Sequence, residues 1–276
     1  MTSSELIENT EEREKILHRP IVQKKFPSNP KDVFKEFKSL KKEQIIKLSL
    51  SAVIIILFGI FNNVHIISSP QPENKCYFDV VHSWFTPLNY FYRGNKSFRA
   101  FLMIVAGLLL DITFLFSIIA WSIYAVDWRF GVNMLLFYGI RYLANETERL
   151  SVPNLMHFEY PGFPSIVVGY VPGDDFFFSG HCGFPMVNMM EYIWLRKYWL
   201  AAFCAFTTSF EMFLMLSNRG HYIVDIIVGI VFGQYISIHG RNWVKFIYDH
   251  IEFLNKLKMD NRKELKRINV DWDIGD

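Results

Sequence analysis

The amino-acid sequence predicts an all-α fold, that of a polytopic membrane protein with six transmembrane helices. Of its 276 residues, 51% are hydrophobic and 17% aromatic, too many for a soluble domain that also carries long polar ends. The apolar residues form continuous runs, several of which reach the ~20 residues that cross a hydrocarbon core. No alternation with a period of two, the pattern of a half-buried strand, competes with these runs.

Composition divides the chain into three parts. Residues 1–44 form a polar N-terminal arm that opens acidic and then becomes rich in lysine, which fits neither a secretory signal nor an arginine-rich transit peptide. Residues 45–240 form the expected six-helix membrane domain, with a catalytic-like core at about 100–240. Residues 241–276 form a charged tail whose apolar residues have helical spacing, as in an amphipathic helix that lies on a membrane or a partner.

The six expected helices follow one another along the membrane domain. The first two segments are longer than a crossing needs, whereas the third is short unless residues 128–147 all contribute. Prolines and glycines crowd the connection at 145–178, which predicts an ordered lid or entrance loop. The six segments are about 45–67, 99–126, 130–144, 179–195, 198–217 and 220–239.

Two polar stretches stand at the ends of apolar segments. One reads DFFFSGH and covers 175–181, and the other reads SNRGHYIVD and covers 217–225. Ionisable groups at such places are costly because hydrocarbon does not solvate them, so by default they indicate a site. If 220–239 is a helix, His221 and Asp225 lie one turn apart on the same face, where side chains meet.

These residue types have complementary chemical roles. The Asp225 carboxylate would accept the imidazole N–H of His221, fix its tautomer and make its other nitrogen a better nucleophile. His181 would protonate a leaving alkoxide, because histidine titrates near neutral pH. Together they suffice for phosphoryl transfer through a phosphohistidine. A single histidine near a helix end is more often a satisfied interfacial residue, and it is the conjunction of the two stretches that favours a site.

The stretches at 173–181 and 219–225 resemble the two catalytic motifs of the sphingomyelin synthase-like branch of the type 2 phosphatidic-acid phosphatase superfamily. They are most similar to those of the plant phosphatidylcholine:diacylglycerol cholinephosphotransferases, which read FFxSGH and TRGHYTxD. The resemblance implies a six-helix membrane fold and transfer of phosphocholine between lipids through a histidine intermediate, without metal or other cofactor. It also implies that His221 is the nucleophile, Asp225 its partner and His181 the acid and base.

The chain departs from these patterns at a few positions. The K-x6-R-P signature of the wider superfamily is absent, which argues against a plain lipid phosphatase. Ile223 stands where the close relatives have threonine, and Cys182 stands where they have threonine or valine. Neither difference removes a group that transfers protons, so the expected chemistry is retained.

Phosphoryl transfer also needs positive charge on the phosphate oxygens. Arg219 is the first candidate and Arg141 the second, with snorkelling towards the interface as the alternative role of Arg141. Ser179 and the amide of Gly180, at an expected helix start, offer an anion-binding N-terminus. Asp175, with the aromatic residues beside it, is the candidate for a choline nitrogen.

Two further acids, Asp111 and Glu211, lie inside apolar segments. A carboxylate at such a depth is expected to pair with an arginine, to serve the site, or to bridge two helices.

Charge predicts the orientation. The lysines and arginines of 1–44 and 240–276 outnumber the cations on the opposite side, so the positive-inside rule places both termini in the cytosol or the mitochondrial matrix. Both histidine stretches then fall on the exoplasmic or lumenal side. The endoplasmic reticulum or Golgi is favoured, with the mitochondrial inner membrane as an open alternative.

Three functions of different classes remain open. The leading one is an integral-membrane phosphotransferase that moves a phosphocholine-type headgroup between a phospholipid and diacylglycerol or ceramide. The second is a lipid phosphate phosphatase that uses the same histidines with water as acceptor. The third is an inactive or marginally active subunit of a larger membrane complex, whose polar tails contact protein partners. No metal, cofactor or nucleic acid is expected.

Overall fold

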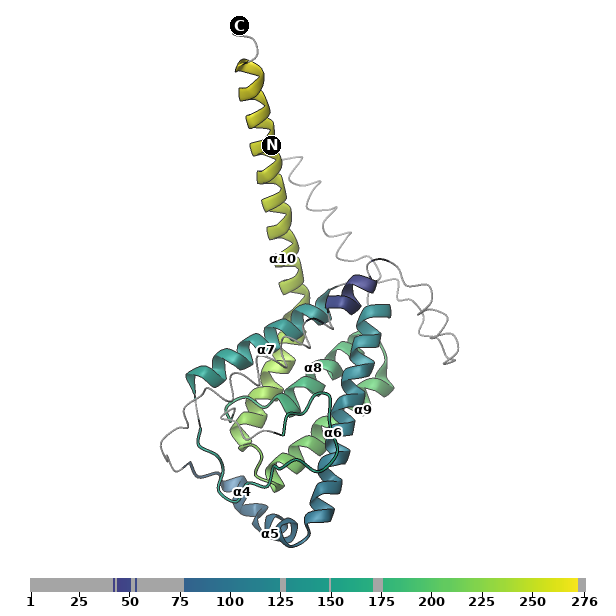
Figure 1. Cartoon of the computed structure of the whole chain (residues 1–276), viewed down its shortest axis with the longest axis vertical. Helices are drawn as coiled ribbons and strands as arrows, with labels where there is room; N and C mark the ends of the chain where they lie inside the picture. The colour runs from purple at the N-terminus through teal and green to yellow at the C-terminus, as the bar shows by residue number, and fades with distance from the viewer. Residues whose placement is uncertain are drawn as a thin grey trace, which may run out of the picture.

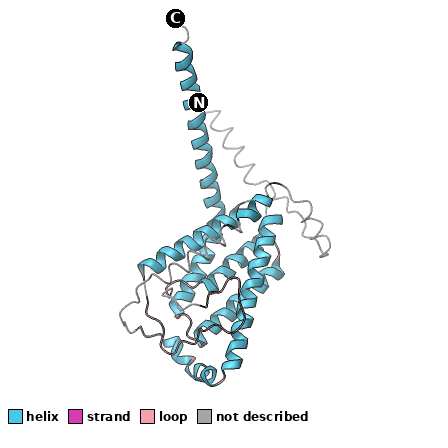
Figure 2. Cartoon of the chain, viewed as in Figure 1, coloured by secondary structure: helices cyan, strands magenta, loops and turns pink. Residues whose placement is uncertain are grey.

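The structure is a computed structural model, and it describes residues 42, 44–50, 53, 77–124, 128–148, 150–170 and 176–272. The regular structure in this part of the chain is helical, which confirms the predicted all-α class (Figure 2). The elements are α4 (Val80–Trp84), α5 (Thr86–Gly94), α6 (Lys96–Ile119), the π-helix η1 (Ala120–Tyr124), α7 (Arg129–Thr147), α8 (Gly180–Trp194), α9 (Tyr198–Ser217) and α10 (Ile223–Trp272).

Helix α8 lies inside the bundle, where it contacts α6, α7, α9 and α10. The two short helices α4 and α5 sit at one end of the bundle, and the C-terminal part of α10 projects from the other end (Figure 1). Helix α10 is continuous through the predicted boundary at residue 240. The first turn of α8 and the first turn of α10 therefore belong to the end that α4 and α5 cover.

Close helix packing brings these two first turns together. A Cβ atom on Gly229 of α10 would overlap the carbonyl oxygen of Ser179, the residue that precedes α8. A Cβ atom on Gly183 of α8 would overlap the ring of Phe137 and lie 2.8 Å from the Gly229 oxygen. Glycine at both positions lets the backbones approach more closely than any side chain would allow, as small residues do in membrane helix pairs. This approach sets His181 beside the segment that precedes α10.

Within the part of the chain that the structure describes, three helices are long and apolar enough to cross a membrane: Lys96–Ile123, Tyr198–Ser217 and Ile223–Gly240. These helices fit a membrane protein. The predicted segments 130–144 and 179–195 correspond to α7 and α8, which do not join this group; α8 has 15 residues with Pro185 inside, fewer than the ~20 that a crossing needs. Most of the predicted segment 45–67 lies outside the described residues. The number of crossings, six, therefore stays a prediction.

The proline-rich connection after α7 is fastened to α6 by one acid. The carboxylate of Asp111 accepts hydrogen bonds from the Ser165 hydroxyl at 2.8 Å and from the Ile166 and Val167 amides, each at 3.0 Å. Asp111, which the sequence left between several roles, thus serves as a loop anchor. Because three donors of the loop share this carboxylate, the loop lies on α6 and passes near the start of α8.

A buried ion pair joins α7 to α8 at the end of the bundle away from α4 and α5. The Arg129 guanidinium donates to Oε2 of Glu191 from Nη2 at 2.7 Å and from Nε at 3.2 Å. The Asn133 amide donates to the other carboxylate oxygen at 2.8 Å, and the Trp194 ring lies 4.7 Å from the guanidinium carbon. Opposite charges that neutralise one another in this way can be buried at a tolerable cost.

Candidate active site

The three predicted catalytic side chains lie together. His181 is in the first turn of α8, Asp225 is in the first turn of α10, and His221 precedes α10. The Nδ1 atom of His221 is 3.3 Å from Oδ2 of Asp225, and its Nε2 atom is 3.2 Å from Nδ1 of His181. A carboxylate only accepts hydrogen bonds, so Nδ1 of His221 carries the hydrogen and Nε2 keeps its lone pair. The arrangement leaves a basic nitrogen that faces the second histidine.

The route to this contact differs from the expected one. The helix that was predicted to start at residue 220 starts at Ile223, so His221 stands in the turn before it. The amide of Tyr222 donates to Oδ2 of Asp225 at 2.9 Å, so a side chain three residues on satisfies an amide at the helix start. The same oxygen therefore caps α10 and orients His221. The histidine and the aspartate meet because the turn folds back, not because they share a helix face.

The preceding turn ends α9 in a Schellman motif. The Gly220 amide bonds to the Met215 carbonyl at 2.8 Å and the Arg219 amide to the Leu216 carbonyl at 3.3 Å. Arg219 occupies the left-handed position, with φ of 56°, where glycine is usual and another residue costs roughly 1–2 kcal/mol. A non-glycine residue at this position indicates that its side chain makes contacts that offset the cost.

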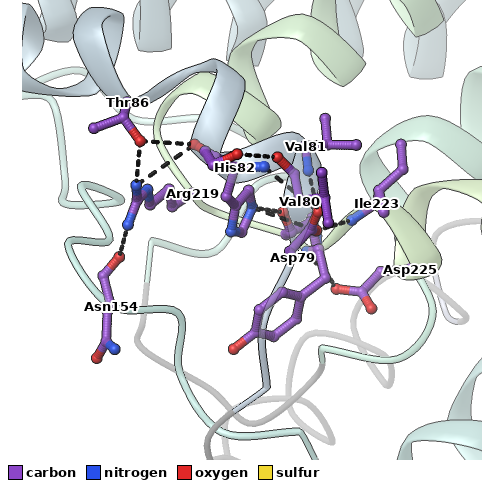
Figure 3. Close-up of polar contacts among 12 residues, drawn as sticks. Asp79, Val80, Val81, His82, Thr86, Asn154, Arg219, Ile223 and Asp225 are labelled. Atoms are coloured by element: carbon purple, nitrogen blue, oxygen red, sulfur yellow. Dashed lines mark hydrogen bonds and ion pairs between the residues drawn. The ribbon is translucent and has the colours of Figure 1, made fainter.

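That side chain points to neighbouring elements (Figure 3). The Arg219 guanidinium donates to the Asn154 carbonyl at 2.9 Å, to the Thr86 hydroxyl at 3.0 Å and to the His82 carbonyl at 3.5 Å. It thereby ties the turn before His221 to the loop and to the junction of α4 and α5. The predicted contact of Arg219 with phosphate stays a prediction, and the observed contacts are those of a brace.

Asp79 fixes the starts of two helices at once, and sequence reasoning missed it. Its Oδ1 accepts the Val81 amide of α4 at 2.8 Å, and its Oδ2 accepts the Ile223 amide of α10 at 2.7 Å (Figure 3). Aspartate is a preferred residue before the first turn of a helix, because the first amides lack intrahelical partners. The available signal was an aspartate just before residues 80–94, but no helix was predicted there from the sequence, whereas the structure has α4 and α5.

His82 is the second residue that the sequence did not single out. Its Nε2 lies 2.8 Å from the carbonyl oxygen of His221, so this nitrogen carries the hydrogen and donates it. The ring stacks on Tyr222 with centroids 5.4 Å apart. Burial lowers the pKa of His82 below the usual 6.5, which keeps the ring neutral at physiological pH. His82 therefore holds the backbone of His221 without bringing a charge to it.

The remaining predicted substrate-binding residues gather at the start of α8. Nε of Arg141 donates to the Phe178 carbonyl at 3.1 Å, and a Cβ atom on Gly180 would lie 3.2 Å from the same nitrogen. The buried Ser179 donates its amide to the Asp225 carbonyl at 3.0 Å, which links the two histidine stretches through the backbone. A guanidinium beside the first turn of α8 suits an anion. Asp175 lies outside the described residues.

These features fit a membrane protein whose helical bundle carries a histidine–histidine–aspartate cluster at one end. The model of the AtPDCT1/2 family, which is phosphatidylcholine:diacylglycerol cholinephosphotransferase-like, matches residues 78–240. The chain belongs to this family. The matched region runs from Phe78 to Gly240 and includes all three clustered side chains together with Asp79 and His82. No curated protein and no solved structure matches the chain. The family name points to a lipid enzyme of the cholinephosphotransferase type.

Proposed function

We propose that the protein is an integral-membrane lipid phosphotransferase, which moves a phosphocholine-type headgroup from a phospholipid to diacylglycerol or ceramide. The observation that carries this proposal is the chain of contacts from Asp225 through His221 to His181, inside the region that the AtPDCT1/2 family matches. A carboxylate, a nucleophilic imidazole and a second imidazole in sequence supply every proton transfer that the reaction needs.

In the first half-reaction, Nε2 of His221 attacks the phosphorus of the donor lipid. The new N–P bond forms as the bond from phosphorus to the diacylglycerol oxygen breaks, and His181 gives that oxygen a proton. Asp225 keeps its hydrogen bond to Nδ1 and stabilises the positive charge of the phosphorylated imidazole. The two imidazole nitrogens now contact each other at 3.2 Å, so the rings separate when phosphorus enters between them.

In the second half-reaction, the hydroxyl group of the acceptor lipid loses its proton to His181. Its oxygen attacks the phosphorus, the N–P bond breaks, and the electron pair returns to Nε2 of His221. His181 ends protonated and His221 neutral, so the site is ready for another donor. The proposed ligands of the phosphate oxygens are Arg141, Ser179 and Gly180, with Arg219 as a further candidate, whereas Asp175 is a candidate for the choline nitrogen.

We also propose a wider architecture for the protein, with its fold, its relatives and its orientation in the membrane. The six-helix membrane fold and the kinship with sphingomyelin synthases and type 2 phosphatidic-acid phosphatases are inferred from the motif resemblance. The site is proposed to face the exoplasm or lumen, with both termini in the cytosol. Helices α4 and α5 cover the site end of the bundle, and they would then lie at that membrane surface (Figure 1).

The test uses the purified protein, phosphatidylcholine labelled in its headgroup, and diacylglycerol with distinguishable acyl chains, beside the variant His221→Ala. We expect label in a phospholipid that carries the acceptor's acyl chains, and none with the variant. A rapid alkaline quench should also leave label on the protein, because a phosphohistidine survives base and not acid.

Other outcomes decide between the alternatives. Water-soluble phosphocholine or phosphate as the product would establish a hydrolase that uses the same histidines. Absence of turnover with several headgroup donors, from a protein that is folded, would favour a structural subunit of a membrane complex.

A further inference from the structure

Glu211 is a fully buried acid, 0% exposed, on the apolar helix α9. Neither of its carboxylate oxygens has a hydrogen-bond partner among the residues that the structure describes. A carboxylate at such a place is costly unless a proton or a cation offsets its charge.

Other acids buried in the bundle differ from Glu211. Asp111 accepts three donors of the loop, and Glu191 accepts the Arg129 guanidinium and the Asn133 amide. Donors within the protein therefore satisfy these two carboxylates, which join parts of the structure. Glu211 is as deeply buried and has no such hydrogen bonds among the described residues, so its carboxyl group is available to a ligand.

Glu211 opens on a narrow cavity that also touches the candidate site. His181 forms one wall, and the rings of Phe158 and Tyr170 from the loop form another, with centroids 5.5 Å apart. The Phe158 ring also meets the His181 ring edge-on at 5.6 Å. The other lining residues are Met103, Ala106, Gly107, Val168, Leu214 and Met215.

This lining selects one kind of cation. A metal ion needs several oxygen, nitrogen or sulfur ligands, and a primary ammonium needs acceptors for three N–H donors, whereas most of this wall is apolar. A quaternary ammonium has no N–H group, and aromatic faces with one carboxylate suit it. Burial raises the pKa of Tyr170 to about 12, with Glu211 and Asp111 adding to the effect, so this ring is a neutral phenol.

We infer that Glu211, with the rings of Phe158 and Tyr170, binds the quaternary ammonium of the headgroup and selects phosphocholine over phosphoethanolamine. The inference rests on the proposed function, because it places the headgroup nitrogen in the cavity beside His181 while His221 holds the phosphorus. Two carbon atoms link the nitrogen to the phosphate oxygen in choline, and the cavity that Glu211 lines begins at His181, which contacts His221. The loop that carries the two rings moves outward to admit it.

The first test measures binding without turnover, on the background His221→Ala. Short-chain phosphatidylcholine and phosphatidylethanolamine are titrated by calorimetry in nanodiscs. We expect the background protein to bind phosphatidylcholine about tenfold more tightly, from the cation–π and charge contacts, and Glu211→Gln to reduce the preference to within about twofold. Glu211→Asp, which keeps the charge, should retain part of it. Glu148→Gln, the same change at an exposed carboxylate, should leave it unchanged.

The second test compares kcat/KM for the two donor lipids in the active protein. Glu211→Gln should lower the value for phosphatidylcholine about tenfold through KM and leave phosphatidylethanolamine nearly unchanged. An equal loss with both donors, or an unchanged binding preference, overturns the inference. Thermal unfolding reports whether each variant folds; if Glu211→Gln does not, Tyr170→Leu should lower the preference about fivefold, and no change would count against the inference. A wild-type protein without turnover contradicts the proposed function, whereas the binding test still decides the role of Glu211.

Discussion

The two ends of helix α8 carry buried polar clusters built on opposite principles. At its C-terminal end Glu191 is paired with Arg129 at 2.7 Å, so a carboxylate and a guanidinium offset each other inside the bundle. At its N-terminal end His181 meets His221, which in turn meets Asp225, and imidazoles change their charge near neutral pH. One cluster fixes charge inside the bundle, and the other is able to move protons.

The comparison indicates that the Arg129–Glu191 end stabilises the bundle, whereas the other end holds the proposed catalytic side chains. The guanidinium and carboxylate at the far end satisfy each other and need no external ligand. At the site end, three side chains form hydrogen bonds to the backbone and to neighbouring elements, namely those of Asp79, His82 and Arg219. These bonds position His221. They leave its Nε2 nitrogen facing the second histidine. Mutations at the two ends should therefore have separable effects on activity and on stability.

The largest expected effect is the loss of transfer in His221→Ala. Removal of a nucleophile should lower kcat/KM by about 10⁴-fold or more, because no other described group takes its place. The unfolding temperature should change by only a few degrees. His239→Ala, which removes a histidine about four turns into α10, is the matched control and should keep most of the activity. Retained transfer in His221→Ala would remove the histidine from the role of nucleophile.

The second effect belongs to the far end. Glu191→Ala leaves the Arg129 guanidinium buried without its carboxylate and should cost about 3–5 kcal/mol of unfolding free energy. Activity per folded molecule should stay within about threefold, because the pair lies at the other end of α8. The double variant Arg129→Met with Glu191→Met should recover much of the stability. A large loss of kcat in folded Glu191→Ala would show that the two ends are coupled.

Arg219 gives the third and more moderate effect. As a brace, Arg219→Ala should lower unfolding free energy by about 1–2 kcal/mol and kcat/KM by about tenfold, through misplacement of His221. Thr86→Val, which removes one acceptor of the guanidinium, should reproduce part of both effects. A loss above about a hundredfold in Arg219→Ala with unchanged stability and no effect of Thr86→Val would instead support the predicted contact with phosphate.

The sequence predicted the features that depend on local pattern. Apolar runs located α6, α7, α8 and α9 to within a few residues, because burial in hydrocarbon demands continuous apolar residues. The likeness to phosphatidylcholine:diacylglycerol cholinephosphotransferases that was inferred from 173–181 and 219–225 is confirmed by the family match.

What the sequence could not predict depends on remote contacts. Asp79 meets Ile223 and His82 meets His221 across 144 and 139 residues, and no local pattern reports such a distance. The same reason explains Arg219, whose acceptors come from α5 and the loop. It also explains Glu211 and Asp111, which look alike as acids in apolar segments and differ only in what the fold sets opposite them.

The smallest effect comes from acid, and it should separate the two ends. The pKa of His82 in the folded protein lies below the 6.5 of the unfolded chain because of burial, and that of His157 is also lowered. Below pH 6.5 the unfolded chain therefore binds more protons than the folded chain. The contribution of His82 to the free energy of unfolding is fully present above that pH and decreases as the pH falls towards the folded pKa. The hydrogen-exchange protection factors, which correct for the intrinsic pH dependence of amide exchange, should fall in α4 and in the turn before α10 between pH 7.5 and 5.5, and not at the Arg129–Glu191 end.

His82→Phe tests the origin of this acid effect while it keeps a ring against Tyr222. The variant leaves the His221 carbonyl without its donor, which should cost about 1 kcal/mol at neutral pH. It should also make the stability of the site end less sensitive to acid, because the contribution of His82 is lost and that of His157, also in the described part of the chain, remains. If the fall below pH 6.5 is as steep in His82→Phe as in the wild type, the sensitivity belongs to other histidines. If the protection factors fall equally at the two ends, the acid effect does not come from the site end.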